Sequence, residues 1–244
     1  MIRFVAETGS TNADLLAAGE AADEGTWLVA HRQRAGRGRA GRAWDDGAGN
    51  FMGSTVVRLW PGDPPTQTLA LAAGLAAHNA IADLPGAPPG LLLKWPNDLL
   101  VGSAKLGGIL LERHSDRVVV GIGINLAHAP ALPDRPTAAF ADFAPAPTIE
   151  AFAPLLAARL ADVLGRWHGG DWAGVRRDWL DRAHPPGTPL AVRDGDGRPI
   201  RGVFAGVGEN GAAHLRLADG GTRAIHAGDV EMLAMTGPSD AAGD

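Results

Sequence analysis

The sequence predicts an α+β protein in two parts, a larger domain of strands and helices followed by a small all-β barrel. Up to about residue 184, apolar runs of strand length alternate with apolar or amphipathic runs of helix length. Beyond Pro185 and Pro186, short alternating segments are separated by Asp-Gly and Asn-Gly turns of hairpin type. The 244 residues, 45% of them hydrophobic, suffice for two cores. We expect domains at 1–184 and 185–236, and a frayed tail at 237–244.

The order of elements follows from these runs. In the larger domain we expect strands at 2–6, 26–31, 51–59, 91–95, 99–101, 105–113 and 117–126, and helices at 12–22, 66–84, 148–167 and 171–183. In the barrel we expect strands at 190–193, 200–207, 213–217 and 222–225, with turns at 194–197, 209–211 and 219–221. Residues 66–84 are apolar almost all round, which indicates a buried helix. Residues 114–116 form a hairpin-type connection, and the Pro/Ala-rich residues 127–147 are expected to form an extended surface loop.

Composition excludes several classes of function. The formal net charge of −5 argues against general nucleic-acid binding, which favours a basic domain. The absence of cysteine excludes disulfides, thiolate zinc sites and a thiol nucleophile, and no pair among the eight histidines has metal-ligand spacing. We recognise no signal peptide, and no apolar run reaches the roughly 18 residues of a membrane span. The cytoplasm is therefore the expected compartment.

The most informative segment is an Arg/Gly-rich loop, Gln33-Arg34-Ala35-Gly36-Arg37-Gly38-Arg39-Ala40-Gly41-Arg42-Ala43, which precedes Trp44. Its glycines allow backbone N–H groups to turn toward a ligand, and consecutive N–H groups can form a concave anion site. Its arginines supply planar forks that suit carboxylate and phosphate. The loop therefore predicts a ligand that carries concentrated negative charge.

Four other interpretations of this loop stay open. The spacing of Gly36, Gly38 and Gly41 satisfies the dinucleotide fingerprint, but that motif should open a helix and the following residues are typical of a loop. The spacing nearly satisfies the P-loop pattern, but Arg42 and Ala43 stand where Lys and Ser or Thr are required. Arg/Gly repeats can be disordered RNA-binding tracts, but this one is bracketed by strands. A solvated basic turn is the simplest alternative. Dense Gly-Arg alternation within a folded core favours an ordered anion-binding loop.

Two polar clusters each have a structural and a functional interpretation. Ser10-Thr11-Asn12 precedes a helix, where a hydroxyl would cap the helix whatever the function, or would offer a partner to a polar ligand group. Lys94 ends an apolar run, where a charge is costly unless it is paired. It could pair with Asp98. Alternatively, Asn97 and Asp98 could hold Mg²⁺ or a ribose while Lys94 faces phosphate.

Glycines and polar residues also interrupt two later strands. Gly107 and Gly108 follow Lys105, and the run 118–126 carries two glycines before Asn125. Glycine inside a strand often marks the close approach of a ligand or another backbone. Each cluster alone can be explained by packing. Together, the polar and glycine residues in these apolar strands favour one shared pocket.

These segments resemble the biotin protein ligases, in the family's order and over about 125 residues. The resemblance is carried by Gly9-Ser10-Thr11-Asn12, Gln33, Gly36-Arg37-Gly38-Arg39-Ala40-Gly41-Arg42, Trp44, Lys94-Trp95-Pro96-Asn97-Asp98, Lys105-Leu106-Gly107-Gly108-Ile109-Leu110 and Gly121-Ile122-Gly123-Ile124-Asn125. It implies a central mixed sheet flanked by helices, of the class II synthetase type, followed by an SH3-like barrel. It also implies a two-step reaction. Biotin's carboxylate attacks ATP to give biotinyl-5′-AMP and pyrophosphate, and a lysine of a biotin carboxyl carrier protein then attacks the mixed anhydride.

The same resemblance implies roles for individual residues, with biotin as substrate and ATP and Mg²⁺ as cofactors. Biotin would be bound by Ser10, Thr11, Asn12, Gln33, Arg37, Gly38, Arg39 and Lys105, with backbone N–H groups of residues 37–39 at its carboxylate. ATP or the adenylate would be bound by Gly36, Arg39, Trp44, Lys94, Asn97, Asp98 and Asn125. Arg39 and Lys105 would be catalytic, Trp44 would stack on adenine, and Asp98 would be a metal ligand. Trp95 is expected to pack in the core.

Some members of the family carry an N-terminal winged helix-turn-helix and act as repressors. Here the Ser-Thr-Asn motif begins at residue 10, so we expect a short form that binds neither DNA nor a membrane. The family can dimerise through its catalytic sheet, which makes a homodimer compatible with the resemblance. Two alternatives stay open. A lipoate or octanoate ligase or transferase shares the fold and the acyl-adenylate chemistry, and a nucleic-acid binder would use the Arg/Gly tract with steep salt dependence.

Overall fold

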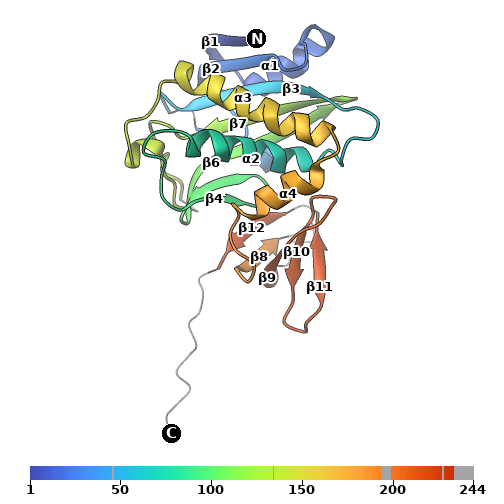
Figure 1. Ribbon diagram of the computed structural model, residues 1–244. Coiled ribbons are helices and arrows are strands. Elements are labelled where there is room, and N and C mark those ends of the chain that lie inside the picture. The colour runs from blue at the N-terminus through green and yellow to red at the C-terminus, as the bar shows by residue number, and fades with distance from the viewer. Residues whose placement is uncertain (46, 134, 194–198, 227, 234–244) are drawn as a thin grey trace.

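Two sheets organise the protein, whose computed structural model describes residues 1–45, 47–133, 135–193, 199–226 and 228–233 (Figure 1). The strands of the larger sheet are β1 (Ile2–Thr8), β2 (Trp27–Gln33), β3 (Phe51–Arg58), β4 (Leu91–Lys94), β5 (Asp98–Val101), β6 (Ala104–His114) and β7 (Arg117–Ile124). They lie in the order β1-β2-β3-β7-β6-β5-β4. β1 and β2 are parallel and the other neighbours are antiparallel. The central mixed sheet is thereby confirmed.

Helices cover both faces of this sheet. They are α1 (Thr11–Ala18), α2 (Thr68–Ala82), α3 (Ile149–His168) and α4 (Trp172–Leu180), with short 3₁₀ turns η1 (Gly19–Ala21), η2 (Arg39–Gly41) and η3 (Phe140–Asp142). Side chains alternate between the faces along each strand. Val57 and Val120 belong to the core with α2 and α3, whereas Val56 and Val119 form a second cluster with Leu15 of α1. α1 therefore packs on the face opposite to α2 and α3.

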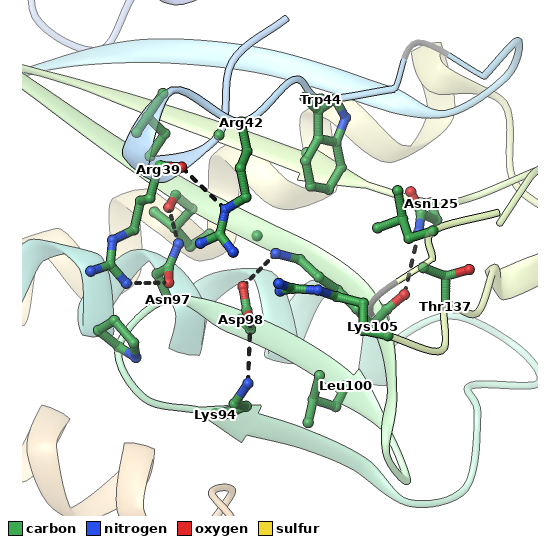
Figure 2. A pocket seen from close by; sticks show the side chains of 18 of the residues that line it. Arg39, Arg42, Trp44, Lys94, Asn97, Asp98, Leu100, Lys105, Asn125 and Thr137 are labelled. Atoms are coloured by element: carbon green, nitrogen blue, oxygen red, sulfur yellow. Dashed lines mark hydrogen bonds and ion pairs between the residues drawn. The ribbon is translucent and has the colours of Figure 1, made fainter. Parts of the chain in front are cut away.

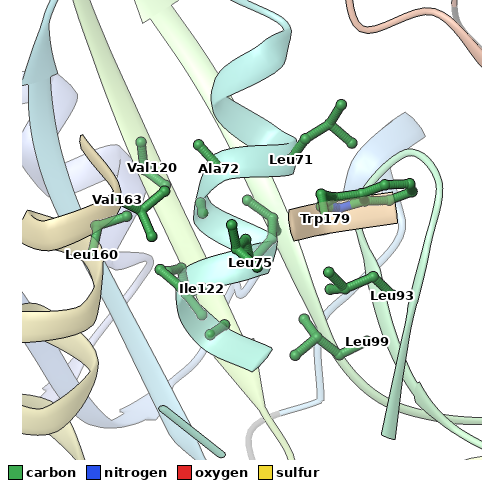
Figure 3. Close-up of a cluster of buried hydrophobic side chains, with 14 of the residues drawn as sticks. Leu71, Ala72, Leu75, Leu93, Leu99, Val120, Ile122, Leu160, Val163 and Trp179 are labelled. Atoms are coloured by element: carbon green, nitrogen blue, oxygen red, sulfur yellow. The ribbon is translucent and has the colours of Figure 1, made fainter. Parts of the chain in front are cut away.

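α2 is the centre of the main core. Twelve of its fifteen residues are buried, as the apolar composition of the segment predicts. Figure 3 shows Leu71 and Leu75 of α2 among side chains of the sheet, of α3 and of α4. At its start, Thr68 Oγ1 accepts a hydrogen bond of 2.8 Å from Trp167 Nε1 of α3. This polar contact fixes α3 against α2 without leaving the buried indole donor unpaired.

A short antiparallel sheet follows α4 and confirms the small all-β unit. Its strands are β8 (Pro189–Arg193), β9 (Pro199–Val207), β10 (Ala213–Arg216), β11 (Thr222–Ile225) and β12 (Asp229–Met232), in the order β11-β10-β9-β8-β12. β12 was not predicted. Its partner, β8, is distant in sequence, so no local turn signals the pairing. The predicted turn at 194–197 and tail at 237–244 lie outside the described residues. The division into domains at residues 184 and 185 stays a prediction.

Three predicted elements are corrected by the structure. The helix expected at 12–22 ends at Ala18, because Gly19 takes a positive φ of 53° and closes the last turn. The helix expected at 171–183 ends at Leu180, because Ala183 pairs instead with Leu93 of β4. The loop expected on the surface at 127–147 is partly internal. Ala138 donates its N–H to the carbonyl of Lys105 at 2.9 Å, and Phe140 is buried.

Side-chain hydrogen bonds fasten the small sheet unit to the large one. Trp95 Nε1 donates to the Gly211 carbonyl at 2.9 Å, and Trp172 Nε1 donates to the Glu209 carbonyl at 2.6 Å. Trp95 is buried, as expected of a packing residue. Beside this junction His184 packs against Phe204, and burial lowers the pKa of His184 to about 4. Its imidazole is thus neutral near pH 7 and acts as a packing group.

No helix among the described residues has both the length and the apolar composition that crossing a bilayer requires. The longest, α3, begins with a capped first turn. Thr148 is the N-cap, and its hydroxyl accepts a hydrogen bond of 3.2 Å from the Ala151 N–H.

Replacing Thr148 by Ala should remove that cap and lower the free energy of unfolding by about 1 kcal/mol. For a chain of this size the melting temperature should fall by roughly 2–4 °C. Calorimetry would measure the shift. Thr148→Ser keeps the hydroxyl and should retain the wild-type melting temperature; an equal loss in both variants would show that the cap is not the cause.

Candidate active site

A cavity of ≈ 1040 Å³ is lined by residues of both sheets. It contains every residue that the sequence predicts to bind biotin or ATP, except Gly36. The residues come together because β6 and β7 form an antiparallel hairpin, which sets the start of β6 beside the end of β7. β5 pairs with the same end of β6. Figure 2 shows the result: Arg39, Arg42 and Trp44 come from the Arg/Gly loop, and Lys94, Asp98 and Lys105 face them from β4 to β6.

The cavity is positively charged, although the chain carries a formal net charge of −5. Among the described residues that line it, eight are Lys or Arg and three are Asp or Glu. Arg135, from the loop after β7, and Arg193 and Arg201, from the small sheet, were not predicted. No local motif marks these three arginines, since only the fold brings them to the cavity. A lining with this balance of charge favours an anionic ligand.

The Arg/Gly loop folds back on itself. Arg37 forms an antiparallel bridge with Ala43, and Trp44 donates its N–H to the Gly36 carbonyl at 2.9 Å. Gly36 lies outside the cavity lining because it forms the base of this hairpin, where a Cβ would come 2.9 Å from the Trp44 carbonyl oxygen. Gly38 donates its N–H to the Arg42 carbonyl at 2.7 Å. Of the three N–H groups expected to bind a carboxylate, those of residues 37–39, the Gly38 N–H is therefore engaged within the loop, and a ligand would have to displace that bond.

Arg39 extends from this loop toward two other segments. Its guanidinium donates to Asn97 Oδ1 at 3.0 Å and to the Gly228 carbonyl at 3.3 Å. Asn97 is itself fixed, because its Nδ2 donates to the Ile109 carbonyl at 2.7 Å. Asn97 thus acts here as the residue that orients Arg39, a task the sequence did not reveal.

Lys105, Asp98 and Lys94 form a row of charges on the opposite wall (Figure 2). Lys105 Nζ lies 2.6 Å from Asp98 Oδ1, and Lys94 Nζ lies 3.9 Å from Asp98 Oδ2. The pairing expected between Lys94 and Asp98 is present, and Lys105 makes the shorter contact with the same carboxylate. Lys105 Nζ also lies 5.7 Å from the centre of the Trp44 ring. Two cations and one carboxylate leave a net positive charge on this wall.

The indole of Trp44 lies directly on β7. A Cβ on Gly123 would come 2.5 Å from two of the ring atoms, so only glycine allows this approach. Nearby, Asn125 donates its side-chain N–H to the Ala138 carbonyl at 3.1 Å, which holds the segment after β7 in place. Among the residues that the structure describes, Trp44 Nε1 and Asn125 Oδ1 are buried without a hydrogen-bond partner. Buried polar atoms without a partner are costly, so a ligand or water that hydrogen-bonds to these two atoms would remove that cost.

A polar network lines another part of the same cavity, at the start of α1. Ser10 is the N-cap of α1, and its hydroxyl accepts from the Ala13 N–H at 3.5 Å. The capping interpretation thus holds, while Thr11 and Asn12 are buried and line the cavity beside Gln33. Two further members of this network, Ser54 of β3 and Glu112 of β6, were not predicted. The sequence signal for Ser54 was the adjacent hydroxyl residues Ser54 and Thr55 within a mostly apolar strand.

The carboxylates do not form a metal cage. Among the described residues, no group of three or more His, Cys, Asp or Glu side chains could hold a metal ion. Asp98 is already paired with Lys105 at 2.6 Å. Mg²⁺ in phosphoryl-transfer sites is commonly held by one or two carboxylates together with substrate phosphates and water. The donor set therefore fits an ion that is held mainly by a triphosphate and water. The contact predicted with Asp98 would require Lys105 to release that carboxylate.

Comparison with known proteins agrees with this geometry. A family model described as the biotin/lipoate A/B protein ligase family matches residues 4–127, and one for the biotin protein ligase C-terminal domain matches residues 187–233. The chain is 36% identical over 240 residues to the biotin–acetyl-CoA-carboxylase ligase of Paracoccus denitrificans, an alignment that covers 93% of this chain and 98% of that protein. It is 37% identical over 237 residues to the enzyme of the same name from Mycobacterium tuberculosis, covering 94% and 88%.

A solved structure has the same fold. The biotin protein ligase of Aquifex aeolicus in complex with biotin and ATP superimposes with a TM-score of 0.82 over 95% of this chain and 99% of that one. At 23% sequence identity, this likeness establishes the fold alone. The family models and the two relatives of similar length carry the assignment. This chain belongs to the biotin/lipoate A/B protein ligase family.

Proposed function

We propose that this protein joins biotin to a lysine of a biotin carboxyl carrier protein, using ATP and passing through biotinyl-5′-AMP. The observation that carries the proposal is the set of chemical groups gathered in one cavity. Its lining includes the polar residues Ser10, Thr11, Asn12, Gln33 and Ser54, the cations Arg39 and Lys105, and Trp44. These groups suit biotin's ureido head, its carboxylate beside a phosphate, and an adenine ring. The two relatives above are named as ligases of this activity.

In the first step a carboxylate oxygen of biotin attacks the α-phosphorus of ATP. The bond from that phosphorus to the bridging oxygen breaks, and pyrophosphate leaves with the bond's electron pair. Both reactants are anions, so the site must reduce their repulsion. Lys105 and Arg39 supply positive charge from opposite walls, and Asn97 and Asp98 hold these cations in position. Mg²⁺ would neutralise charge on the departing phosphates.

In the second step the amine of the acceptor lysine attacks the acyl carbon of the mixed anhydride. The bond from that carbon to the phosphate oxygen breaks, AMP leaves, and the nitrogen loses a proton. No enzyme nucleophile is required, which suits a chain without cysteine. Catalysis is then mainly positioning and charge stabilisation. The acceptor is a carboxylase's biotin carrier domain, and we place the reaction in the cytoplasm, with no DNA or membrane as a partner.

Trp44→Ala should weaken ATP binding more than biotin binding. Stacking on an aromatic side chain is worth roughly 1–3 kcal/mol per base, which corresponds to about a 5- to 150-fold rise in the KM for ATP. The KM for biotin should change by less than about threefold, since the Trp44 indole makes no hydrogen bond to the polar residues assigned to biotin. Steady-state titration of each substrate would measure both constants. Equal losses for ATP and biotin would contradict the adenine-stacking role.

ATP–pyrophosphate exchange tests the function as a whole. The purified protein would be assayed with Mg²⁺ and, in parallel, biotin, lipoate or octanoate. Exchange with biotin alone is the expected result. Exchange with lipoate or octanoate would move the protein to the lipoate branch of its family, and no exchange with any acid would overturn the ligase assignment.

A further inference from the structure

A continuous chain of hydrogen bonds connects the cavity residues that are assigned to biotin. Gln33 Oε1 accepts from the backbone N–H of Thr11 at 2.7 Å. The Thr11 hydroxyl lies 2.6 Å from the Ser54 hydroxyl, which lies 2.5 Å from Asn12 Oδ1. Asn12 Nδ2 then donates to Glu112 Oε2 at 2.8 Å. Four of these five side chains are at least nine-tenths buried and line the cavity; Glu112 does not line it.

The carboxylate at the end of the chain determines the direction of donation. A carboxylate can only accept hydrogen bonds, so Asn12 must turn Nδ2 toward Glu112 and Oδ1 toward Ser54. Oδ1 is also only an acceptor, so the Ser54 hydroxyl must donate its single proton to Asn12. In its contact with Ser54, the Thr11 hydroxyl is then the donor. The side-chain protons of Thr11, Ser54 and Asn12 are therefore all donated in the direction of Glu112.

This direction leaves two acceptors available to a ligand. The Thr11 hydroxyl can also donate to Gln33 Oε1, at 3.0 Å, so Gln33 and Ser54 compete for its single proton. Because the Ser54 contact is shorter, at 2.6 Å, we assign the proton to Ser54. Gln33 Oε1 thus keeps a lone pair beyond the one used by the Thr11 N–H, and the Thr11 oxygen also keeps accepting capacity. Were Asn12 turned over, its Nδ2 would donate to Ser54, Ser54 to Thr11, and Thr11 to Gln33 Oε1. The reversed chain would occupy that acceptor.

We propose that Glu112 is a positioning residue for biotin specificity: it fixes the donor direction of this chain, so that Thr11 and Gln33 accept the ureido N–H groups. The inference rests on the proposed function. Gly121 is required by this arrangement, because a Cβ there would come 2.3 Å from Asn12 Oδ1 and would displace the Asn12 amide from the hydrogen-bond chain.

The test compares the intact wild-type protein with Glu112→Gln, Ser54→Ala and the double variant in biotin-dependent ATP–pyrophosphate exchange. Gln keeps the size of Glu but can donate as well as accept, so both directions of the chain become available. Loss of one well-directed hydrogen bond should raise the KM for biotin by about tenfold. The kcat and the KM for ATP should stay within about twofold of wild type. Glu20→Gln, an exposed carboxylate in η1, is the matched control and should leave all three constants unchanged.

Two readouts separate this role from a merely structural one. If Glu112 acts through Ser54, the double variant should show the same KM for biotin as Ser54→Ala alone; multiplied effects would overturn the proposal. The preference for biotin over an analogue methylated at a ureido nitrogen should also fall about tenfold in Glu112→Gln, because only biotin can use the acceptor. An equal loss for both ligands would overturn it as well.

The remaining outcomes are distinguishable. An active wild type together with an unchanged KM for biotin in Glu112→Gln would overturn the role of Glu112 alone. A wild type without biotin-dependent exchange would overturn the proposed function, and this role with it. If Glu112→Gln does not fold, Ser54→Ala breaks the same chain. It should show the same loss of preference for biotin over the methylated analogue, and a retained preference would overturn the proposal.

Discussion

Replacing Lys105 by Met is expected to lower the rate of biotin adenylation by about 10²–10³-fold, the usual cost of removing one group that stabilises transition-state charge. Lys105 is a cavity cation on the wall opposite Arg39, where the carboxylate and the α-phosphate would meet. Without it, the two anions repel each other with one fewer cation between them. Asp98 would also lose its closest partner, at 2.6 Å, and add a further negative charge to the same wall. Single-turnover formation of biotinyl-5′-AMP would measure the effect directly.

Two variants make this result specific. Lys105→Arg keeps a cation and should retain more activity than Lys105→Met, although a guanidinium does not reproduce the position of an ammonium. Arg159→Met removes a cation on the surface, where Arg159 pairs with Asp83, and should leave the adenylation rate unchanged. Adenylation by Lys105→Met at the wild-type rate would show that the charge of Lys105 does not stabilise the transition state.

Arg39→Gly is expected to form the adenylate but to release it before transfer. The guanidinium spans from the Arg/Gly loop to Asn97 and to the carbonyl of Gly228, so it fastens the loop over the cavity. Hydrogen bonds to a charged group contribute roughly 1.5–3 kcal/mol each, so a net loss equal to one such bond corresponds to about a 10- to 150-fold faster escape of the intermediate. Free biotinyl-5′-AMP acylates exposed lysines without selection. A mixture of the carrier protein and bystander proteins should therefore be labelled indiscriminately.

The control lies in the same loop. Arg34 is exposed, pairs with Glu7 at the surface and is outside the cavity lining. Arg34→Gly introduces the same glycine and should confine labelling to the carrier. Labelling that stays confined to the carrier in Arg39→Gly would contradict the retaining role of Arg39. Equal bystander labelling by both variants would instead assign the leak to loop flexibility.

How much of the site could be predicted depended on how local its signals were. Three signals each lie within a few consecutive residues: the Arg/Gly loop, the Lys-Trp-Pro-Asn-Asp segment, and the strands that contain glycines. Thirteen of the fourteen predicted site residues line one cavity as a result. Gly36 is the exception, because its role in the loop hairpin depends on Trp44, eight positions later. Ser54 and Glu112 were missed because nothing near them in sequence shows that they meet Asn12.

The sequence by itself determined the order and type of most elements, the apolar core of α2 and the family, because hydrophobic period, turn residues and local motifs are properties of short segments. Only the tertiary structure determined which of the site's donors and acceptors already have a hydrogen-bond or ion-pair partner within the protein. The Gly38 N–H binds Arg42, Asp98 binds Lys105, and the Asn12 amide points its Nδ2 at Glu112. Each of these choices depends on which donors and acceptors long-range pairing brings within hydrogen-bonding distance, about 3 Å. Local sequence motifs therefore predict which residues form the site, and the tertiary structure determines which of those residues pair with one another.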